Sequence, residues 1–148
     1  MSQTGQATIN KALTILEKRL TKPSEFFHTT SNTTDYLKIK LANLEYEEFH
    51  VLLLNNQHGL IEDVCMFKGT IDGATVYPRE VLKLALHYNA AAVILAHNHP
   101  SGMCLPSESD RLITERLKEA LSLVDIRVLD HIIVGGMDTH SFASKGIL

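Results

Sequence analysis

The chain has 148 residues, of which 45% are hydrophobic and 21% charged, a composition typical of a soluble globular protein. This length fits one domain with a substantial core better than two small domains. The formal net charge of −3 argues against a non-specific nucleic-acid binder, which normally has a basic face. Direct binding to nucleic acid is therefore not expected, although a local basic patch would be compatible with this charge.

The cysteines and the apolar segments indicate a cellular compartment. Cys65 and Cys104 form no C-x-x-C pair and suggest no disulfide framework. No basic start followed by an apolar stretch marks a signal peptide. The longest purely apolar run, at 90–96, is far too short to span a bilayer. These features favour a reduced, cytoplasmic protein that does not enter a membrane.

The N-terminal third is predicted to form two helices. The first, at about 6–20, has an apolar stripe and should end at Lys22-Pro23. The second is expected at about 33–43. The residues of the stripe are Ile9, Leu13, Leu16 and Leu20, and those of the second helix expected to face inward are Tyr36, Leu37, Leu41 and Leu44. Packing and partner contact explain this segment equally well. We therefore expect a helical segment over 1–44 and a separate domain over 45–148.

Strands are predicted next. The apolar run 49–54 indicates a buried strand, the polar stretch 55–59 a hairpin turn, and 60–67 a second strand. A short strand is expected at 75–77. Pro78 suits the first position of a helix over about 78–88. Its apolar residues are spread so broadly that this helix should be buried on most sides.

The rest of the chain is also predicted to alternate between strands and helices. A central strand covered on both faces is predicted at 91–97 and a helix at 108–124. A strand near 126–134, a Gly135-Gly136 turn and a short strand around 141–143 close the chain. The predicted class is α/β, with a mixed sheet and helices on both of its sides.

The segment from His97 to Asp110 contains candidate metal ligands. Residues two apart on a strand point to the same face, so His97 and His99 can aim two imidazoles at one point. A Pro-Ser-Gly turn follows, and Asp110 in the first turn of the next helix could add a carboxylate there. Such a set suits Zn2+ in tetrahedral geometry. Three protein ligands leave a fourth position for water, which is typical of a catalytic zinc site.

Each part of this pattern also has a structural explanation. Two histidines separated by one residue occur often by chance. Ser107 and Asp110 match a helix capping box, and Asp110 also suits the positive end of the helix dipole. The combination is less easily accidental, because a strand end, a turn and a capped helix converge.

The spacing of these residues resembles a known family. His97-x-His99, seven residues, Ser107, two residues and Asp110 match the JAMM (MPN+) metalloprotease motif. The segments 76–81 (VYPREV), 97–102 (HNHPSG) and Asp130-His131 resemble the RadC family within that group. The resemblance covers roughly residues 45–148. It implies a mixed sheet between helices, related to the cytidine deaminase fold, and a zinc-dependent peptidase or isopeptidase-like hydrolase.

A hydrolytic zinc site also needs a general base, usually a carboxylate. Glu45, Glu47 and Glu48 precede the strand at 49–54. Strand alternation puts Glu45 and Glu47 on one face and Glu48 on the other, but it does not identify the base. An acidic cluster at a strand start can also be merely solvated. The resemblance to RadC-like sequences selects Glu47, two positions before Phe49.

The resemblance gives Ser107 the role of donating a hydrogen bond to the developing oxyanion, which competes with its capping role.

Cys104 lies between the ligands, but the family has no ligand there, and an exposed loop thiol is expected. His131 either orients a ligand or is an ordinary strand histidine. The other histidines have no metal spacing and are expected to be ordinary. They are His28, His50, His58, His87 and His140.

The leading hypothesis is thus a zinc metallohydrolase that acts on a peptide or protein substrate, with Glu47 transferring the proton to the leaving amine. The alternative is a DNA-repair or mobile-element-associated protein, as RadC proteins have historically been viewed. The N-terminal segment lacks the helix-hairpin-helix module usual in that family, which weakens this alternative. A nucleoside deaminase would need H-x-E and P-C-x-x-C, and neither is present. A metal-bound scaffold without catalysis remains open, and so does the oligomeric state.

Overall fold

A five-stranded mixed sheet forms the centre of the structure, a computed structural model that describes residues 2–19, 23, 25–69 and 76–148. Its strands are β1 (Glu47–Leu54), β2 (Leu60–Gly69), β3 (Ala92–Asn98), β4 (Arg127–Gly135) and β5 (Asp138–Ser141). They lie in the order β2-β1-β3-β4-β5. Only β3 and β4 pair in parallel. The predicted α/β class with a mixed sheet is confirmed.

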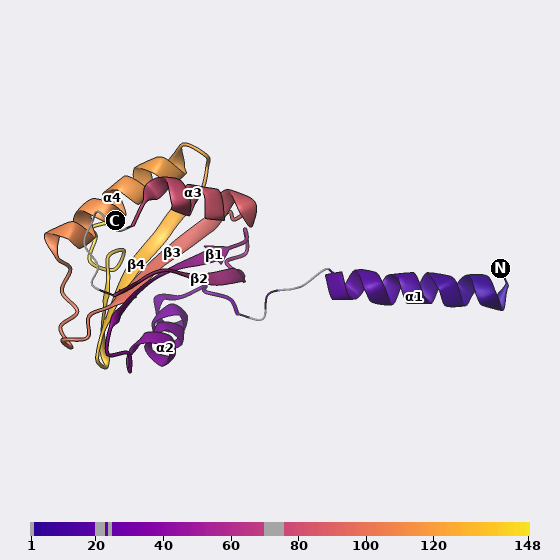
Figure 1. Cartoon of the computed structure of the whole chain (residues 1–148), viewed down its shortest axis with the longest axis horizontal. Helices are drawn as coiled ribbons and strands as arrows, with labels where there is room; N and C mark the ends of the chain where they lie inside the picture. Colours follow the sequence, from indigo (N-terminus) through magenta and orange to yellow (C-terminus); the bar gives the residue numbers. More distant parts are fainter. Residues whose placement is uncertain (1, 20–22, 24, 70–75) are drawn as a thin grey trace.

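Helices cover both faces of this sheet. α3 (Pro78–His87) and α4 (Glu108–Ser122) lie over one face, and α2 (Thr30–Leu41) lies over the other (Figure 1). Each face has its own apolar core, because β1 alternates its side chains between the two. Every residue of β3 is buried, as predicted for a central strand.

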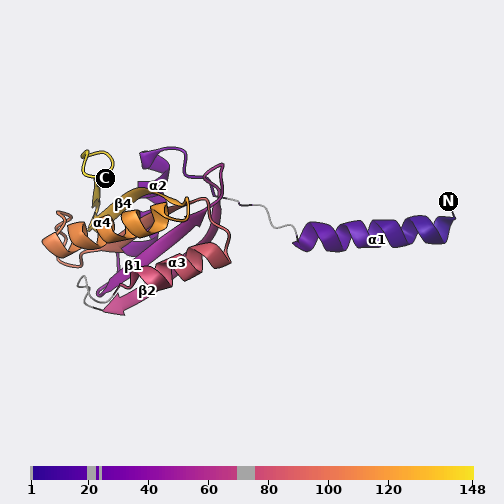
Figure 2. The same cartoon turned by 90° about the horizontal axis from the view of Figure 1, so that it is seen from above.

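The N-terminal helix α1 (Gln3–Arg19) lies apart from the sheet in both views (Figures 1 and 2). It has no buried residue, and the side chains of Leu13 and Leu16 are 52% and 48% exposed. Packing inside the domain therefore does not account for its apolar stripe. The last residue of that stripe, Leu20, lies outside the described residues. No helix in the described part of the chain has the length and apolarity needed to cross a bilayer.

Three details differ from the sequence-based expectation. Val76 and Tyr77 form a bend and a helix N-cap instead of a strand, while Thr75 lies outside the described residues. α3 is not buried on most sides. Only one of its faces meets the core, so Val81 and Ala85 are buried while Leu86 is 54% exposed. The last strand ends at Ser141, because the chain turns there, and was predicted too late in the sequence.

Candidate metal centre

Three polar side chains meet where β3 ends and α4 begins. His97 and His99 point to the face of the sheet that α4 covers, and Asp110 lies in the first turn of α4. The Nε2 atoms of His97 and His99 are 3.0 Å apart. Oδ1 of Asp110 lies 3.2 Å from Nε2 of His97, and Oδ2 lies 3.3 Å from Nε2 of His99. The structure thus brings together the three residues predicted as metal ligands.

A capping box fixes the position of Asp110. The backbone N–H of Ser107 donates to Oδ2 of Asp110 over 2.8 Å, and the backbone N–H of Asp110 donates to Oγ of Ser107 over 3.0 Å. The predicted cap is therefore present. Capping uses only a lone pair of the Ser107 oxygen, so its O–H proton stays able to donate to another group. The capping and oxyanion roles use the lone pair and the proton of the same hydroxyl, so they do not exclude each other.

The loop after β3 determines the orientation of His99. Nδ1 of His99 lies 2.8 Å from the carbonyl oxygen of Met103, and only an N–H can donate to a carbonyl. In a neutral ring this leaves Nε2 with a bare lone pair that points at Asp110. The loop itself lies so close to the end of β4 that a Cβ on Gly135 would stand 2.9 Å from backbone atoms of Gly102, Met103 and Cys104.

A buried chain of hydrogen bonds determines the orientation of the His97 ring. The hydroxyl of Thr114 donates to the carbonyl oxygen of Asp110 over 2.6 Å, so its oxygen must accept from Nδ1 of His131. Complete burial, with His97 nearby, lowers the pKa of His131 well below its usual value and keeps this ring neutral. Nε2 of His131 therefore accepts from Nδ1 of His97 over 2.8 Å. In a neutral His97 ring, Nε2 is then a bare lone pair as well.

Two imidazole lone pairs and a carboxylate thus converge at one point, and such a cluster needs a positive charge. Burial by itself raises the pKa of Asp110, but hydrogen bonding with His97 and His99 outweighs it and holds that pKa far below its usual range. The contact with Asp110 in turn raises the pKa of His99. The charge can be a proton on one ring or a metal ion.

The donor set and its spacing suit a metal ion. Two ligand atoms at about 2.0 Å from zinc lie about 3.3 Å apart at the tetrahedral angle. The two nitrogens are 3.0 Å apart, and each lies 3.2 or 3.3 Å from a different oxygen of the Asp110 carboxylate, Oδ1 for His97 and Oδ2 for His99. The hydrogen bonds from Nδ1 of each histidine are also the support that metal-ligating imidazoles usually have. These residues can therefore hold a divalent cation.

The three candidate bases are placed differently. Glu48 points to the opposite face of the sheet, where its Oε1 bonds His50, so it does not reach this centre. Glu45 is exposed and precedes β1. Glu47 lies on the same face as Phe49, and its carboxylate is close enough to raise the pKa of His99 by Coulombic attraction.

The neighbours of Glu47 are held by a residue that the sequence analysis did not single out. Asn98 points to the face opposite His97 and His99 and is buried. Its Oδ1 accepts from the backbone N–H of Glu48, and its Nδ2 donates to the carbonyl of Tyr46. Asn98 thus fixes the backbone on both sides of Glu47. Its position between two candidate ligands was a signal that could have identified it.

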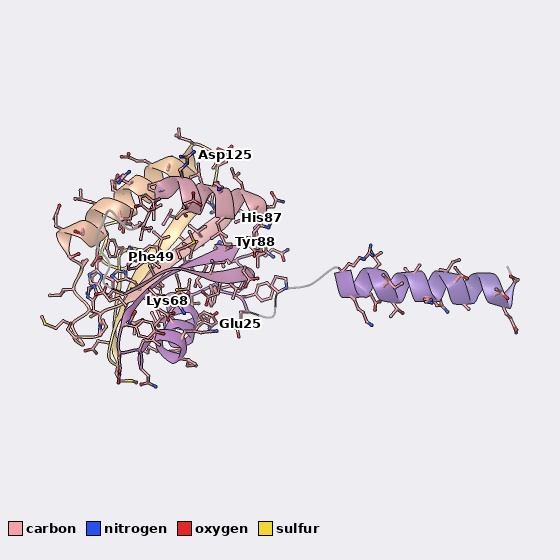
Figure 3. The ribbon with its side chains drawn as sticks, viewed as in Figure 1. Glu25, Phe49, Lys68, His87, Tyr88 and Asp125 are labelled. Carbon is pink, nitrogen blue, oxygen red and sulfur yellow. The ribbon has the colours of Figure 1, made fainter. Side chains whose placement is uncertain are left out.

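Aromatic contacts close the inner side of the centre. Phe49, on β1, stacks on the ring of His97 with 5.9 Å between centroids and meets His131 edge-on at 5.7 Å. It lies within the sheet's core below α3 and α4 (Figure 3). The histidines therefore have water-excluding packing on one side. Of the three side chains predicted as metal ligands, that of His99 is the most exposed, at 18%.

The remaining candidates have other positions. Cys104, predicted to be an exposed loop thiol, is half-buried in the loop and is not among the three side chains that approach one another. Asp130 accepts from the backbone N–H groups of His131 and Ala143 and from the hydroxyl of Ser141. It therefore secures the turn after β5. The sequence analysis named His131 as a possible support but missed Thr114, which completes the chain to His97.

A mixed five-stranded sheet between helices, with a group able to hold a metal ion at the end of its central strand, is consistent with a JAB domain. The family model described as RadC-like JAB domain matches residues 27–147, and the chain belongs to this family. It is 60% identical over 140 residues to a UPF0758 protein of Vibrio cholerae, covering 95% of this chain and 87% of that protein. It is also 53% identical over 148 residues to UPF0758 protein YeeS of Escherichia coli, covering both chains completely.

Proposed function

We propose that the protein is a zinc-dependent hydrolase that cleaves an amide bond in a peptide or protein. The observation that carries this proposal is the convergence of the Nε2 atoms of His97 and His99 on the carboxylate of Asp110, while Nδ1 of each ring is engaged in a hydrogen bond. Zinc is the metal that best suits two imidazoles and one carboxylate in tetrahedral geometry. Three protein ligands also leave one position open, as in catalytic sites.

When bound, zinc supplies Lewis acidity and activates water toward a carbonyl. Glu47 is the proposed general base: it takes a proton from the attacking water and delivers it to the leaving amine. Its carboxylate is on the correct face of the sheet, and Asn98 holds the backbone beside it. Ser107, whose O–H is left free to donate by its capping contact, is proposed to bind the developing oxyanion.

Metal content tests the ligand set. Elemental analysis of the purified chain should show one zinc fewer per chain in Asp110→Asn and in His97→Ala than in the unmodified protein. The matched control is His87→Ala, which removes an exposed histidine at the end of α3. Unchanged zinc content in both ligand variants would overturn the proposed centre.

Turnover tests the role of Glu47. The zinc-loaded protein is incubated with a library of end-blocked peptides, and new amino termini are identified by mass spectrometry. Glu47→Gln should lower the cleavage rate by about 10²- to 10⁴-fold without changing zinc content. Glu45→Gln, which alters an exposed neighbour, should have little effect. Equal turnover in Glu47→Gln would remove this residue from the mechanism, and absence of cleavage by the unmodified zinc-loaded protein would contradict amide hydrolysis.

A further inference from the structure

A second cluster of metal-ligating groups lies on the other face of β1. Glu48 and His50 alternate with the residues that face the first centre, so their side chains point toward α2. Cys65, on the neighbouring strand β2, is the cross-strand partner of His50. One carboxylate oxygen, one ring nitrogen and the thiol sulfur lie within 4.8 Å of one another. None of these residues belongs to the centre described above.

An irregularity in the β1–β2 ladder creates this cluster. Phe49 pairs with Phe67, but His50 pairs with Cys65, so Met66 is an extra residue in β2. In an unbroken register, Cys65 would pair with Val51 and point to the side of α3. The bulge instead brings its thiol opposite His50. Such bulges are frequent where a strand must redirect a side chain next to a functional site.

The ring of His50 has the support that a metal-ligating imidazole requires. Its Nδ1 lies 2.6 Å from Oδ1 of Asp63, and Oδ2 of Asp63 lies 2.7 Å from the hydroxyl of Tyr36. The carboxylate therefore accepts the Nδ1 proton and holds the ring so that Nε2 faces Glu48 at 2.8 Å. A carboxylate behind a histidine in this way fixes its tautomer and increases its basicity as a ligand.

The cluster is reached from solvent through a pocket. This pocket, about 630 Å³ in volume, is lined by His50, Asp63 and Cys65 together with Tyr36 and Lys40. His50 and Glu48 are nearly buried, with side chains 11% exposed, whereas Cys65 is half-buried. An ion can therefore enter from this side and keep a solvent ligand there, while the carboxylate and imidazole stay shielded.

We propose that Glu48, His50 and Cys65 bind a second divalent cation of the zinc and cobalt class, with Asp63 orienting His50. A thiolate, an imidazole and a carboxylate are a donor set that zinc accepts, and cobalt(II) takes the same positions. Binding displaces the proton from Sγ of Cys65, which otherwise donates weakly to the carbonyl of Phe67 over 3.3 Å. It also displaces any proton on Nε2 of His50.

The competing interpretation is a protonated His50 held between the carboxylates of Glu48 and Asp63. That arrangement satisfies both ring nitrogens and leaves the thiol protonated, in hydrogen-bond contact with Glu48 and with the carbonyl of Phe67. The two interpretations differ in one observable property, because only a bound metal forms a bond to sulfur. The experiment therefore monitors that bond directly.

Cobalt(II) is titrated into the full-length protein after removal of metal by a chelator. A sulfur-to-cobalt charge-transfer band in the near ultraviolet should grow to about one equivalent per chain. It should persist in Asp110→Asn, whose first centre is impaired, and be lost in Cys65→Ser. Cys104→Ser is the matched control, since it removes the other half-buried thiol without touching the cluster.

Absence of the band from the unmodified protein, or its persistence in Cys65→Ser, would overturn the second site. Loss of zinc from the first centre alone would not affect this result, so the two proposals fail separately. Asp63→Asn provides a second variant that keeps every ligand. It should weaken cobalt binding by about 10- to 100-fold while preserving the band. Unchanged affinity in a variant that unfolds at the same temperature as the unmodified protein would show that Asp63 does not orient a ligand.

Discussion

The two faces of the sheet carry two differently built clusters. On the α4 side, the ligand groups belong to a strand end and a helix start within residues 97–110, and their support comes from a loop carbonyl and from the chain His131–Thr114. On the α2 side, the groups come from two adjacent strands and depend on a bulge in the ladder. One cluster is thus set by loop and cap geometry and the other by strand register.

The difference shows how one strand can serve two sites without mixing them. Glu47 and Phe49 face the first cluster, whereas Glu48 and His50 face the second, because neighbouring strand residues point to opposite faces. Asn98 belongs to neither cluster but bonds the backbone of Tyr46 and Glu48, where β1 begins. A change that disturbs the loop should affect only the first cluster, and a change in the hairpin only the second.

Gly135→Ala is expected to give the largest difference in metal affinity between the two clusters. The new Cβ would stand 2.9 Å from three backbone atoms of the loop that orients His99, and backbone cannot move aside as a flexible side chain can. We expect zinc affinity at the first centre to fall by about 100-fold. We also expect the free energy of unfolding to fall by about 1–3 kcal/mol. Zinc competition against a chelating indicator and urea denaturation measure the two effects.

The cobalt–thiolate band serves as the internal control for this variant. Gly135 and the loop lie at the end of β4, away from the β1–β2 pair, so the second cluster should bind cobalt as before. Equal weakening at both clusters would mean that the substitution acts by general destabilisation. The contrast between a cluster set by loop geometry and a cluster set by strand register would then not hold.

The first cluster was predictable because its signals are local. Strand alternation places His97 and His99 on one face, and the capping box places Asp110 at the start of α4. The central strand and the hairpin were predictable for the same reason, since each depends on periodicity or turn residues within a short segment. The supporting residue Thr114 was not, because its partner His131 is 17 positions away and reaches it only through the packing of α4 on β4.

The second cluster could not be seen in the sequence. His50 and Cys65 have no metal-ligand spacing, and their pairing depends on one extra residue in β2 that no local pattern indicates. The breadth of the apolar pattern in α3 was misleading in another way. It predicted burial on most sides, but a helix on the outside of a sheet has solvent on its other face, where Leu86 lies.

A moderate effect is expected from Thr114→Val, which keeps the shape of the side chain but removes its hydroxyl. His131 then loses the acceptor for its Nδ1 proton, and the carbonyl of Asp110 loses a donor. The tautomer of His97 is no longer fixed, so zinc affinity at the first centre should fall by about 10-fold or more. Zinc competition at constant protein concentration measures this change.

Thr33→Val is the matched control for that variant. Thr33 is also buried and also donates to the carbonyl four residues earlier, at Thr29, but it lies on α2 and contacts no histidine of the first centre. Its substitution should leave zinc affinity unchanged. If both variants weakened zinc binding alike, the lost helix contact and not the link to His131 would explain the effect.

The smallest effect is expected from Tyr36→Phe, which changes a residue of α2 next to the second cluster. Burial, with Asp63 beside it, raises the pKa of the Tyr36 hydroxyl, which therefore stays protonated and donates to Asp63. Losing this bond should cost about 1 kcal/mol of the free energy of unfolding. Asp63 keeps its bond to His50, so cobalt affinity at the second cluster should fall by less than the loss of about 10- to 100-fold expected for Asp63→Asn. Tyr77→Phe, at an exposed N-cap, is the control. A loss as large as that of Asp63→Asn would mean that Tyr36, and not the strand register, determines the geometry of His50.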